Sequence, residues 1–99
     1  MKEEERLELY NRAIEQWGIP NIVLMVVEEC GEMLNALAKT NRNRSTPDEV
    51  ITELVDVTIL MEQMAVVFGY ERYKAEMERK LERLKNRLDA KYSLINKEK

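Results

Sequence analysis

Five carboxylates stand apart from the other acidic residues because they lie on or beside apolar helix faces: Glu28, Glu29, Glu32, Glu53 and Asp56. Glu29 and Glu32 are three residues apart, and so are Glu53 and Asp56, so each pair sets two carboxylates side by side, one helical turn apart. Half-buried carboxylates lose hydration and repel one another, so they must take up protons, pair with Lys or Arg, or bind a cation. No Lys or Arg is spaced to neutralise the first pair within its own helix.

The other side chains limit which cation such a cluster suits. The chain has no His and one cysteine, Cys30. It therefore cannot form a His-dependent catalytic triad, a His or Cys₄ zinc site within one chain, or the Glu-x-x-His motif of di-iron bundles. Oxygen ligands alone suit Mg²⁺, and Mn²⁺ nearly as well. Spacing alone leaves two interpretations open, a four-carboxylate metal site between two facing helices or a rim of solvated carboxylates on a plain bundle.

Glycine and proline divide the chain into four stretches, each long enough for a helix. Gly18 and Gly69 are stop signals, and Pro20 prevents the first helix from continuing. Thr46 has the character of an N-cap, followed by Glu49 at the third helical position of a capping box. The sequence predicts helices over 3–17, 20–39, 47–68 and 70–92, followed by a polar tail over 93–99.

Each predicted helix carries apolar residues at helical spacing. The stripes are Leu7, Tyr10, Ile14 and Trp17 in the first helix; Ile22, Val26, Met33 and Leu37 in the second; Val50, Leu54, Val57, Met61, Met64 and Phe68 in the third; and Tyr73, Met77, Leu81, Leu84, Leu88 and Tyr92 in the fourth. Short links between four such helices predict an all-α fold, an antiparallel four-helix bundle in a single domain over 1–99, completed by oligomerisation.

Size and charge exclude several classes of protein. Ninety-nine residues make one small domain. The net charge of -3 does not suit a general nucleic-acid binder, although it combines -7 over residues 1–70 with +4 over residues 71–99. The longest apolar run, 22–27, is far too short to span a membrane, and the charged N-terminus is no secretory signal. With one unpaired cysteine, these features predict a cytoplasmic protein without membrane or nucleic-acid partners.

The carboxylate pattern resembles a known family. Glu28-Glu29-Cys30-Gly31-Glu32, followed 21 residues later by Glu53-Leu54-Val55-Asp56, is similar to the EExxE…ExxD signature of MazG-like nucleotide pyrophosphohydrolases. These enzymes belong to the all-α NTP pyrophosphatase superfamily, and the resemblance covers roughly residues 17 to 88.

The resemblance implies an enzyme that hydrolyses nucleoside triphosphates between the α- and β-phosphates, releasing a monophosphate and pyrophosphate. It implies Glu29, Glu32, Glu53 and Asp56 as Mg²⁺ ligands. Glu28 would be a supporting carboxylate, with Glu28 or Glu29 polarising the attacking water. It further implies a homodimer or a tetramer that completes the nucleotide pocket.

One position departs from the family pattern. Family members often carry a second acidic residue just before the later Glu, where this chain has Thr52. Glu49, one turn earlier on the same face, is a candidate substitute. The departure leaves open the number of metal ions and the subfamily.

Phosphate and base contacts are expected from basic and aromatic side chains. Lys80 and Arg83 resemble a basic pair that the family uses near the polyphosphate, and Lys39 belongs to a basic loop that also contains Arg42 and Arg44. Trp17 is expected in the core because it closes an apolar stripe, with stacking on a base as its second interpretation.

Two rival functions use the same residues. The stripe over 73–92 with its charged flanks is typical of a helical interaction module that forms a coiled coil with a partner. A member of the family that binds nucleotides for regulation without hydrolysing them is the other alternative.

Overall fold

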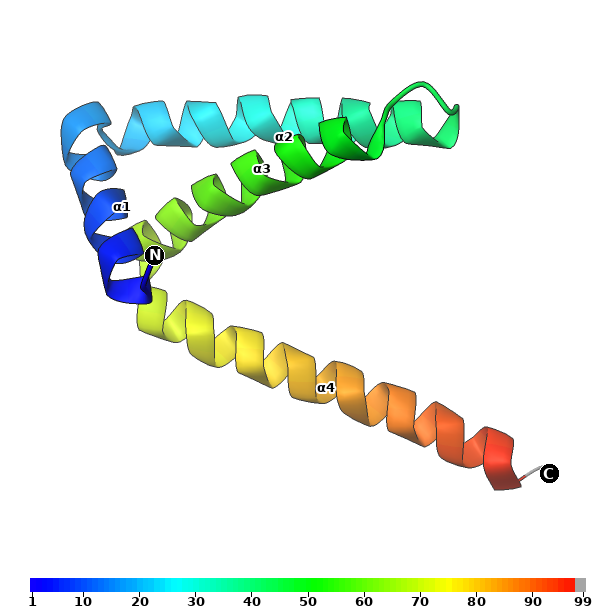
Figure 1. Cartoon of the computed structure of the whole chain (residues 1–99). Coiled ribbons are helices and arrows are strands. Elements are labelled where there is room, and N and C mark those ends of the chain that lie inside the picture. The colour runs from blue at the N-terminus through cyan, green and yellow to red at the C-terminus, as the bar shows by residue number, and fades with distance from the viewer. Residues whose placement is uncertain (98–99) are drawn as a thin grey trace. The chain divides into compact units, whose positions relative to one another are not determined.

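Every regular element of the described chain is an α-helix. In the computed structural model, which describes residues 1–97 and the side chains of residues 1–91, the helices are α1 (Glu3–Trp17), α2 (Ile19–Asn41), α3 (Pro47–Phe68) and α4 (Tyr70–Lys97) (Figure 1). The predicted all-α class is confirmed. The chain divides into two compact units, residues 1–68 and residues 69–99, and each is described by itself.

The helix ends follow the local signals in the sequence, except at the ends of α2 and α4. The prediction that the second helix ends at residue 39 is wrong, because α2 continues to Asn41 and includes Lys39, which was expected in the loop. Gly18 and Gly69 have φ angles of 82° and 131°, a region that L side chains rarely adopt, and they end α1 and α3. The prediction that the last helix ends at residue 92 is wrong, because α4 continues to Lys97. No glycine or proline follows Gly69, so nothing in the chain stops this helix earlier. The last two residues of the expected tail, 98–99, lie outside the described residues.

Two capping motifs make the sharp turn between α2 and α3. Asn43, at a φ of 54°, follows α2, and the amide of Arg44 donates to the carbonyl of Lys39 at 2.8 Å, which is a Schellman arrangement. The Glu49 amide donates to Thr46 Oγ1 at 3.3 Å, and the Thr46 amide donates to Glu49 Oε2 at 3.1 Å. The predicted capping box is confirmed. Together the caps reverse the chain, so that α3 returns beside α2 (Figure 1).

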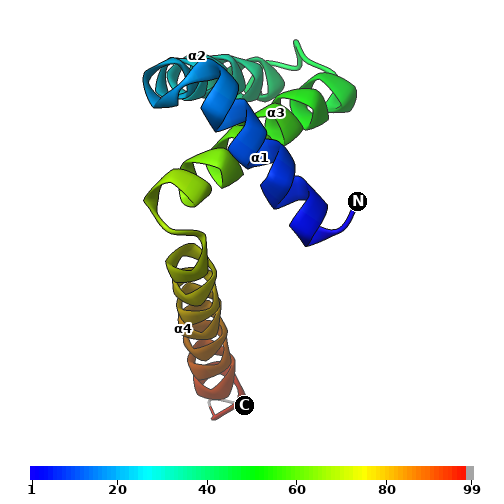
Figure 2. The same ribbon diagram turned by 90° about the vertical axis from the view of Figure 1, so that its left-hand side faces the viewer.

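The helix α1 crosses the later half of α3 (Figure 2). The Tyr10 hydroxyl donates to Glu62 at 2.9 Å, and Arg6 pairs with the same carboxylate at 3.4 Å. Ile22, at 0% exposure, is the most deeply buried of the described side chains, and Leu60 is buried with it. The core of the first unit therefore gathers where the three helices meet.

The side of α3 that packs on α2 is rotated from the predicted stripe toward Glu53. Three stripe residues, Leu54, Met61 and Phe68, are exposed. The packed face instead carries, at spacings of three and four residues, Val50, Glu53, Val57, Leu60, Met64 and Val67, all buried or half-buried. Leu54, Met61 and Phe68 form a second apolar face beside it, and the two faces together make the stripe ambiguous in the sequence.

The second unit is a single helix with an amphipathic pattern. Ion pairs three or four residues apart line its polar surface, Lys74 with Glu71, Arg79 with Glu76 and Lys85 with Asp89. Its apolar stripe, Tyr73, Met77, Leu81, Leu84 and Leu88, is 36–58% exposed, because a lone helix cannot cover its own stripe. The side chain of Tyr92, predicted to belong to it, lies outside the described side chains. Among the described helices, none is long and apolar enough to cross a membrane.

Candidate metal centre

Three of the predicted ligands meet between α2 and α3. Carboxylate oxygens of Glu29, Glu53 and Asp56 all lie within 4.8 Å of one another. Glu29 and Glu53 are half-buried, whereas Asp56 is exposed. Glu29 Oε2 and Glu53 Oε2 are buried without a hydrogen-bond partner among the described residues. The packing thus concentrates negative charge and leaves part of it unsatisfied.

The pKa of Glu29 reflects how close these carboxylates are to one another. Burial raises its pKa, and the nearby Glu32, Glu53 and Asp56 raise it further, to about 7 from an ordinary value of 4.5. A group with this pKa is partly protonated near neutrality, and a cation would displace its proton. The cluster can therefore compensate its charge in two ways, with a proton or with a metal ion.

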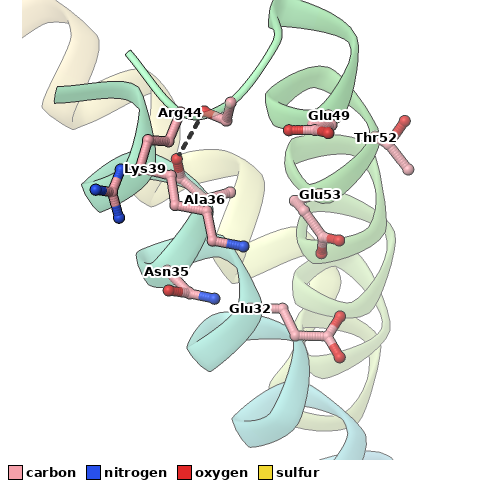
Figure 3. A pocket seen from close by; sticks show the side chains of 9 residues that line it. Glu32, Asn35, Ala36, Lys39, Arg44, Glu49, Thr52 and Glu53 are labelled. Carbon is pink, nitrogen blue, oxygen red and sulfur yellow. Dashed lines mark hydrogen bonds between the residues drawn. The ribbon is translucent and has the colours of Figure 1, made fainter. Parts of the chain in front are cut away.

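Glu32 lies beside this group, at the start of a cavity. The cavity has a volume of about 390 Å³ and is lined by Glu32, Asn35, Ala36, Lys39, Arg44, Ser45, Glu49, Thr52 and Glu53. Glu32 extends from α2 toward α3, and Glu53 lies on the side of α3 that faces α2 (Figure 3). The nearby Glu32 carboxylate is also one of the causes of the raised Glu29 pKa. Glu32 is linked to the triad by this electrostatic effect and by the cavity that it lines with Glu53.

The cavity lining also includes Thr52, where the chain departs from the family pattern, and Glu49, the candidate substitute. Thr52 lines it, and the Thr52 hydroxyl donates to the carbonyl of Asp48 at 3.0 Å, one turn back in α3. Glu49 lines it too, but one of its carboxylate oxygens already caps α3. The capping role explains why a glutamate occupies this position whether or not it also meets a ligand.

The predicted basic residues differ in where they lie. Lys39 reaches from α2 toward the gap between the helices, whereas the guanidinium of Arg44 lies on the α2 side, away from Glu49 and Glu53 (Figure 3). Arg42 caps the end of α2 and does not line the cavity. Lys80 and Arg83 are exposed residues of α4, in the second unit, so their part in the site stays a prediction.

Two other expectations concern Trp17 and Glu28. The expectation that Trp17 is in the core is wrong, since its side chain is 47% exposed at the last position of α1. Gly18 ends the helix immediately after it, and the chain turns away before a neighbour can cover the ring. Glu28 is exposed on α2, next to Glu29, and stands outside the group of three.

One residue near the centre was missed by the sequence interpretation. Gln63 is buried in α3 and lines a second cavity together with Glu29 and Asp56. The available signal was its position seven residues after Asp56, two turns along the same side of the helix.

Comparison with known proteins adds no assignment. No protein-family model, no curated protein and no solved structure matches the chain. The function of the carboxylates is therefore inferred from their own geometry and chemistry.

Proposed function

We propose that the protein is a Mg²⁺-dependent nucleoside triphosphate pyrophosphohydrolase of the MazG-like type. The observation that supports this most directly is the group of Glu29, Glu53 and Asp56, with two buried and unpartnered carboxylate oxygens. Three carboxylates so close together repel one another unless a proton or cation lies between them. Acidic groups are common without an ion, but the unpartnered oxygens distinguish this group from a solvated rim.

The donor set favours a hard cation. Glu29, Glu53 and Asp56 offer only carboxylate oxygens, and Glu32 adds another at the edge of the cavity. Such donors suit Mg²⁺ and, nearly as well, Mn²⁺. A bound divalent ion supplies charge neutralisation at the phosphate oxygens and lowers the pKa of water.

The protein side chains would position the substrate and the water. We assign Glu28 or Glu29 as the carboxylate that accepts a proton from water during its attack on the α-phosphorus, with pyrophosphate as the leaving group. Such a reaction depends on positioning and electrostatic stabilisation, so it needs neither His nor a covalent nucleophile.

The phosphate chain fits best on the cavity side of the carboxylates. Ten residues separate Glu29 from Lys39, a rise of about 15 Å along α2. The Lys39 ammonium would offset the phosphate charge in a cavity whose lining also includes the carboxylates of Glu32, Glu49 and Glu53. Lys80 and Arg83 of α4 are proposed to assist.

We further propose that the protein works as a homodimer or tetramer. Both central helices carry an exposed apolar face at helical spacing, Leu24, Val27 and Leu34 on α2 and Ile51, Leu54, Met61 and Phe68 on α3. A helix that is apolar on two sides normally buries both of them. A second copy pairing across these faces would complete an antiparallel bundle.

A pyrophosphate-release screen tests the proposal. Canonical and modified (d)NTPs are incubated with the full-length protein and Mg²⁺, Mn²⁺ or EDTA, alongside Glu29→Gln and the matched surface variant Glu15→Gln. Hydrolysis that needs the metal, survives in Glu15→Gln and is lost in Glu29→Gln supports it. Metal-dependent nucleotide binding without turnover would instead indicate a regulatory binder, and neither binding nor turnover would favour an interaction module.

A further inference from the structure

A second cavity lies on the other side of the carboxylates from Lys39. It has a volume of about 250 Å³ and is lined by Met25, Glu29, Asp56, Ile59, Leu60 and Gln63. Along α2, the cavity near the turn begins at Glu32 and ends at Lys39, whereas this one uses Met25 and Glu29. The three clustered carboxylates therefore stand where the two cavities adjoin.

The walls of the second cavity differ in character from those of the first. Met25, Ile59 and Leu60 supply apolar surface, and no Lys or Arg lines it. A phosphate group is disfavoured there, because it would meet apolar walls and the carboxylates of Glu29 and Asp56 without a compensating cation from the described residues. A flat, largely apolar group with polar atoms at its rim suits these walls better.

Gln63 supplies the polar contact that such a group would need. Its side chain is only 6% exposed, and its Oε1 is buried without a hydrogen-bond partner among the described residues. A buried carbonyl oxygen left unsatisfied is destabilising, whereas an apolar side chain of the same shape would fit beside Leu60 without that cost. A ligand that donates a hydrogen bond to Oε1 would explain why an amide stands at this buried position.

We propose that this cavity receives the base of the nucleotide and that Gln63 recognises it, with Oε1 accepting a hydrogen bond from an N–H group at the edge of the base. The inference rests on the proposed function. It orients the substrate along the α2–α3 pair, with the base near Gln63, the reacting phosphates at the carboxylates and the leaving pyrophosphate toward Lys39. Met25 lies four residues from Glu29, about 6 Å along α2, so a sugar would bridge the two ends.

Binding to substitution variants tests this orientation. The probes are the non-hydrolysable α,β-methylene triphosphates of adenosine, cytidine, guanosine and uridine, the corresponding nucleotides of pyrimidin-2-one and of unsubstituted purine, whose bases lack an N–H donor, and inorganic tripolyphosphate, which lacks a base. Affinities are measured by calorimetry with Mg²⁺ for the native protein, for Gln63→Met and Gln63→Asn, and for Gln16→Met, an exposed glutamine of α1.

The expected pattern separates recognition from structure. Gln63→Met should weaken binding of the preferred nucleotide about tenfold while leaving tripolyphosphate binding unchanged. The donor-free nucleotide of the same ring type, pyrimidin-2-one or purine, should bind the native protein as weakly as the preferred nucleotide binds Gln63→Met. The melting temperature of Gln63→Met without ligand should equal or exceed that of the native protein, whereas loss of a structural hydrogen bond would lower it. The nucleotide affinity of Gln63→Asn, which keeps an amide, should fall between those of the native protein and Gln63→Met. Gln16→Met should bind nucleotides as the native protein does.

Two results would overturn the inference, and they are distinguishable. If the native protein hydrolyses (d)NTPs but Gln63→Met leaves every affinity unchanged, the cavity holds only water and base recognition lies elsewhere. If the native protein neither hydrolyses (d)NTPs nor binds tripolyphosphate with Mg²⁺, the proposed function fails, and the base site fails with it.

Discussion

Carboxylate oxygens of Glu29 and Glu53 lie within 4.8 Å of each other, although the two residues come from different helices, α2 and α3. Each has one buried oxygen without a hydrogen-bond partner among the described residues. Their approach places charge inside a helix pair whose other contacts are largely apolar. Stability alone gives no reason for this arrangement, because two apolar residues would pack the same space without repulsion.

Glu29 is both a proposed metal ligand and a candidate general base. Glu29→Gln should lower Mg²⁺-dependent pyrophosphate release by at least about 100-fold, because it removes one anionic ligand and a candidate base. Far-ultraviolet circular dichroism should be unchanged, since glutamine keeps the shape and helix propensity of glutamate. Full activity in this variant would exclude the assigned site.

The raised pKa of Glu29 predicts a pH dependence of stability. Because the folded pKa, about 7, lies above the ordinary value of 4.5, the folded protein holds this proton more tightly than the unfolded chain does. The contribution of Glu29 to stability is therefore fully present below pH 4.5 and is lost as the pH rises through about 7. The melting temperature of native protein relative to Glu29→Gln should fall over this interval in metal-free buffer.

Added Mg²⁺ should reverse that trend. Binding requires the carboxylate form, so Mg²⁺ should raise the native melting temperature clearly at pH 7.5 and little at pH 5. Scanning fluorimetry at both pH values measures the shift in melting temperature that Mg²⁺ causes, with Glu29→Gln as the control. An equal effect of Mg²⁺ on both proteins would count against a site at Glu29.

The second apolar face of α3, formed by Leu54, Met61 and Phe68, predicts that the protein forms a dimer or a tetramer. Leu54 is 51% exposed, and Leu54→Glu would place a charge in the proposed contact between copies. Light scattering should show a dimer or tetramer for the native protein and a shift toward monomer for this variant. The matched variant Glu15→Gln on α1 should keep the native mass, and a native protein that is active as a strict monomer would contradict the proposal.

The docking of α1 depends on Tyr10. Tyr10→Phe removes a hydroxyl that donates to the carboxylate of Glu62, so the free energy of unfolding should drop by about 1–2 kcal/mol in urea titrations. Tyr73→Phe serves as the control, because phenylalanine retains the ring contact with Tyr70. Equal losses in the two variants would show that the bond to Glu62 adds nothing specific.

The capping box predicts a smaller local effect. Thr46→Ala should cost about 1 kcal/mol, because the amide of Glu49 loses its side-chain acceptor at the start of α3. Thr46→Ser keeps the hydroxyl and should restore most of the loss. A neutral alanine variant would indicate that solvent satisfies this amide equally well.

Local signals in the sequence were sufficient for the four helices and for the ends of α1 and α3, but not for the ends of α2 and α4. Gly18, Gly69 and the Thr46–Glu49 box act within a few residues, so their effect on the chain does not depend on distant contacts. The exposed end of α1 shows the limit of this reasoning. The spacing of Trp17 matched an apolar stripe, but whether a neighbouring helix covers the ring is not encoded in spacing.

The sequence by itself determined which carboxylates are available and how they are paired along the chain. It also excluded chemistry that needs His or more than one Cys. Only the tertiary structure decided which helix sides meet. Because α3 is apolar on two adjoining sides, periodicity could not tell whether Glu53 borders the packed face or belongs to it. Packing against α2 places Glu53 on that face, brings Glu53 and Asp56 to Glu29, and leaves Gln63 buried beside them.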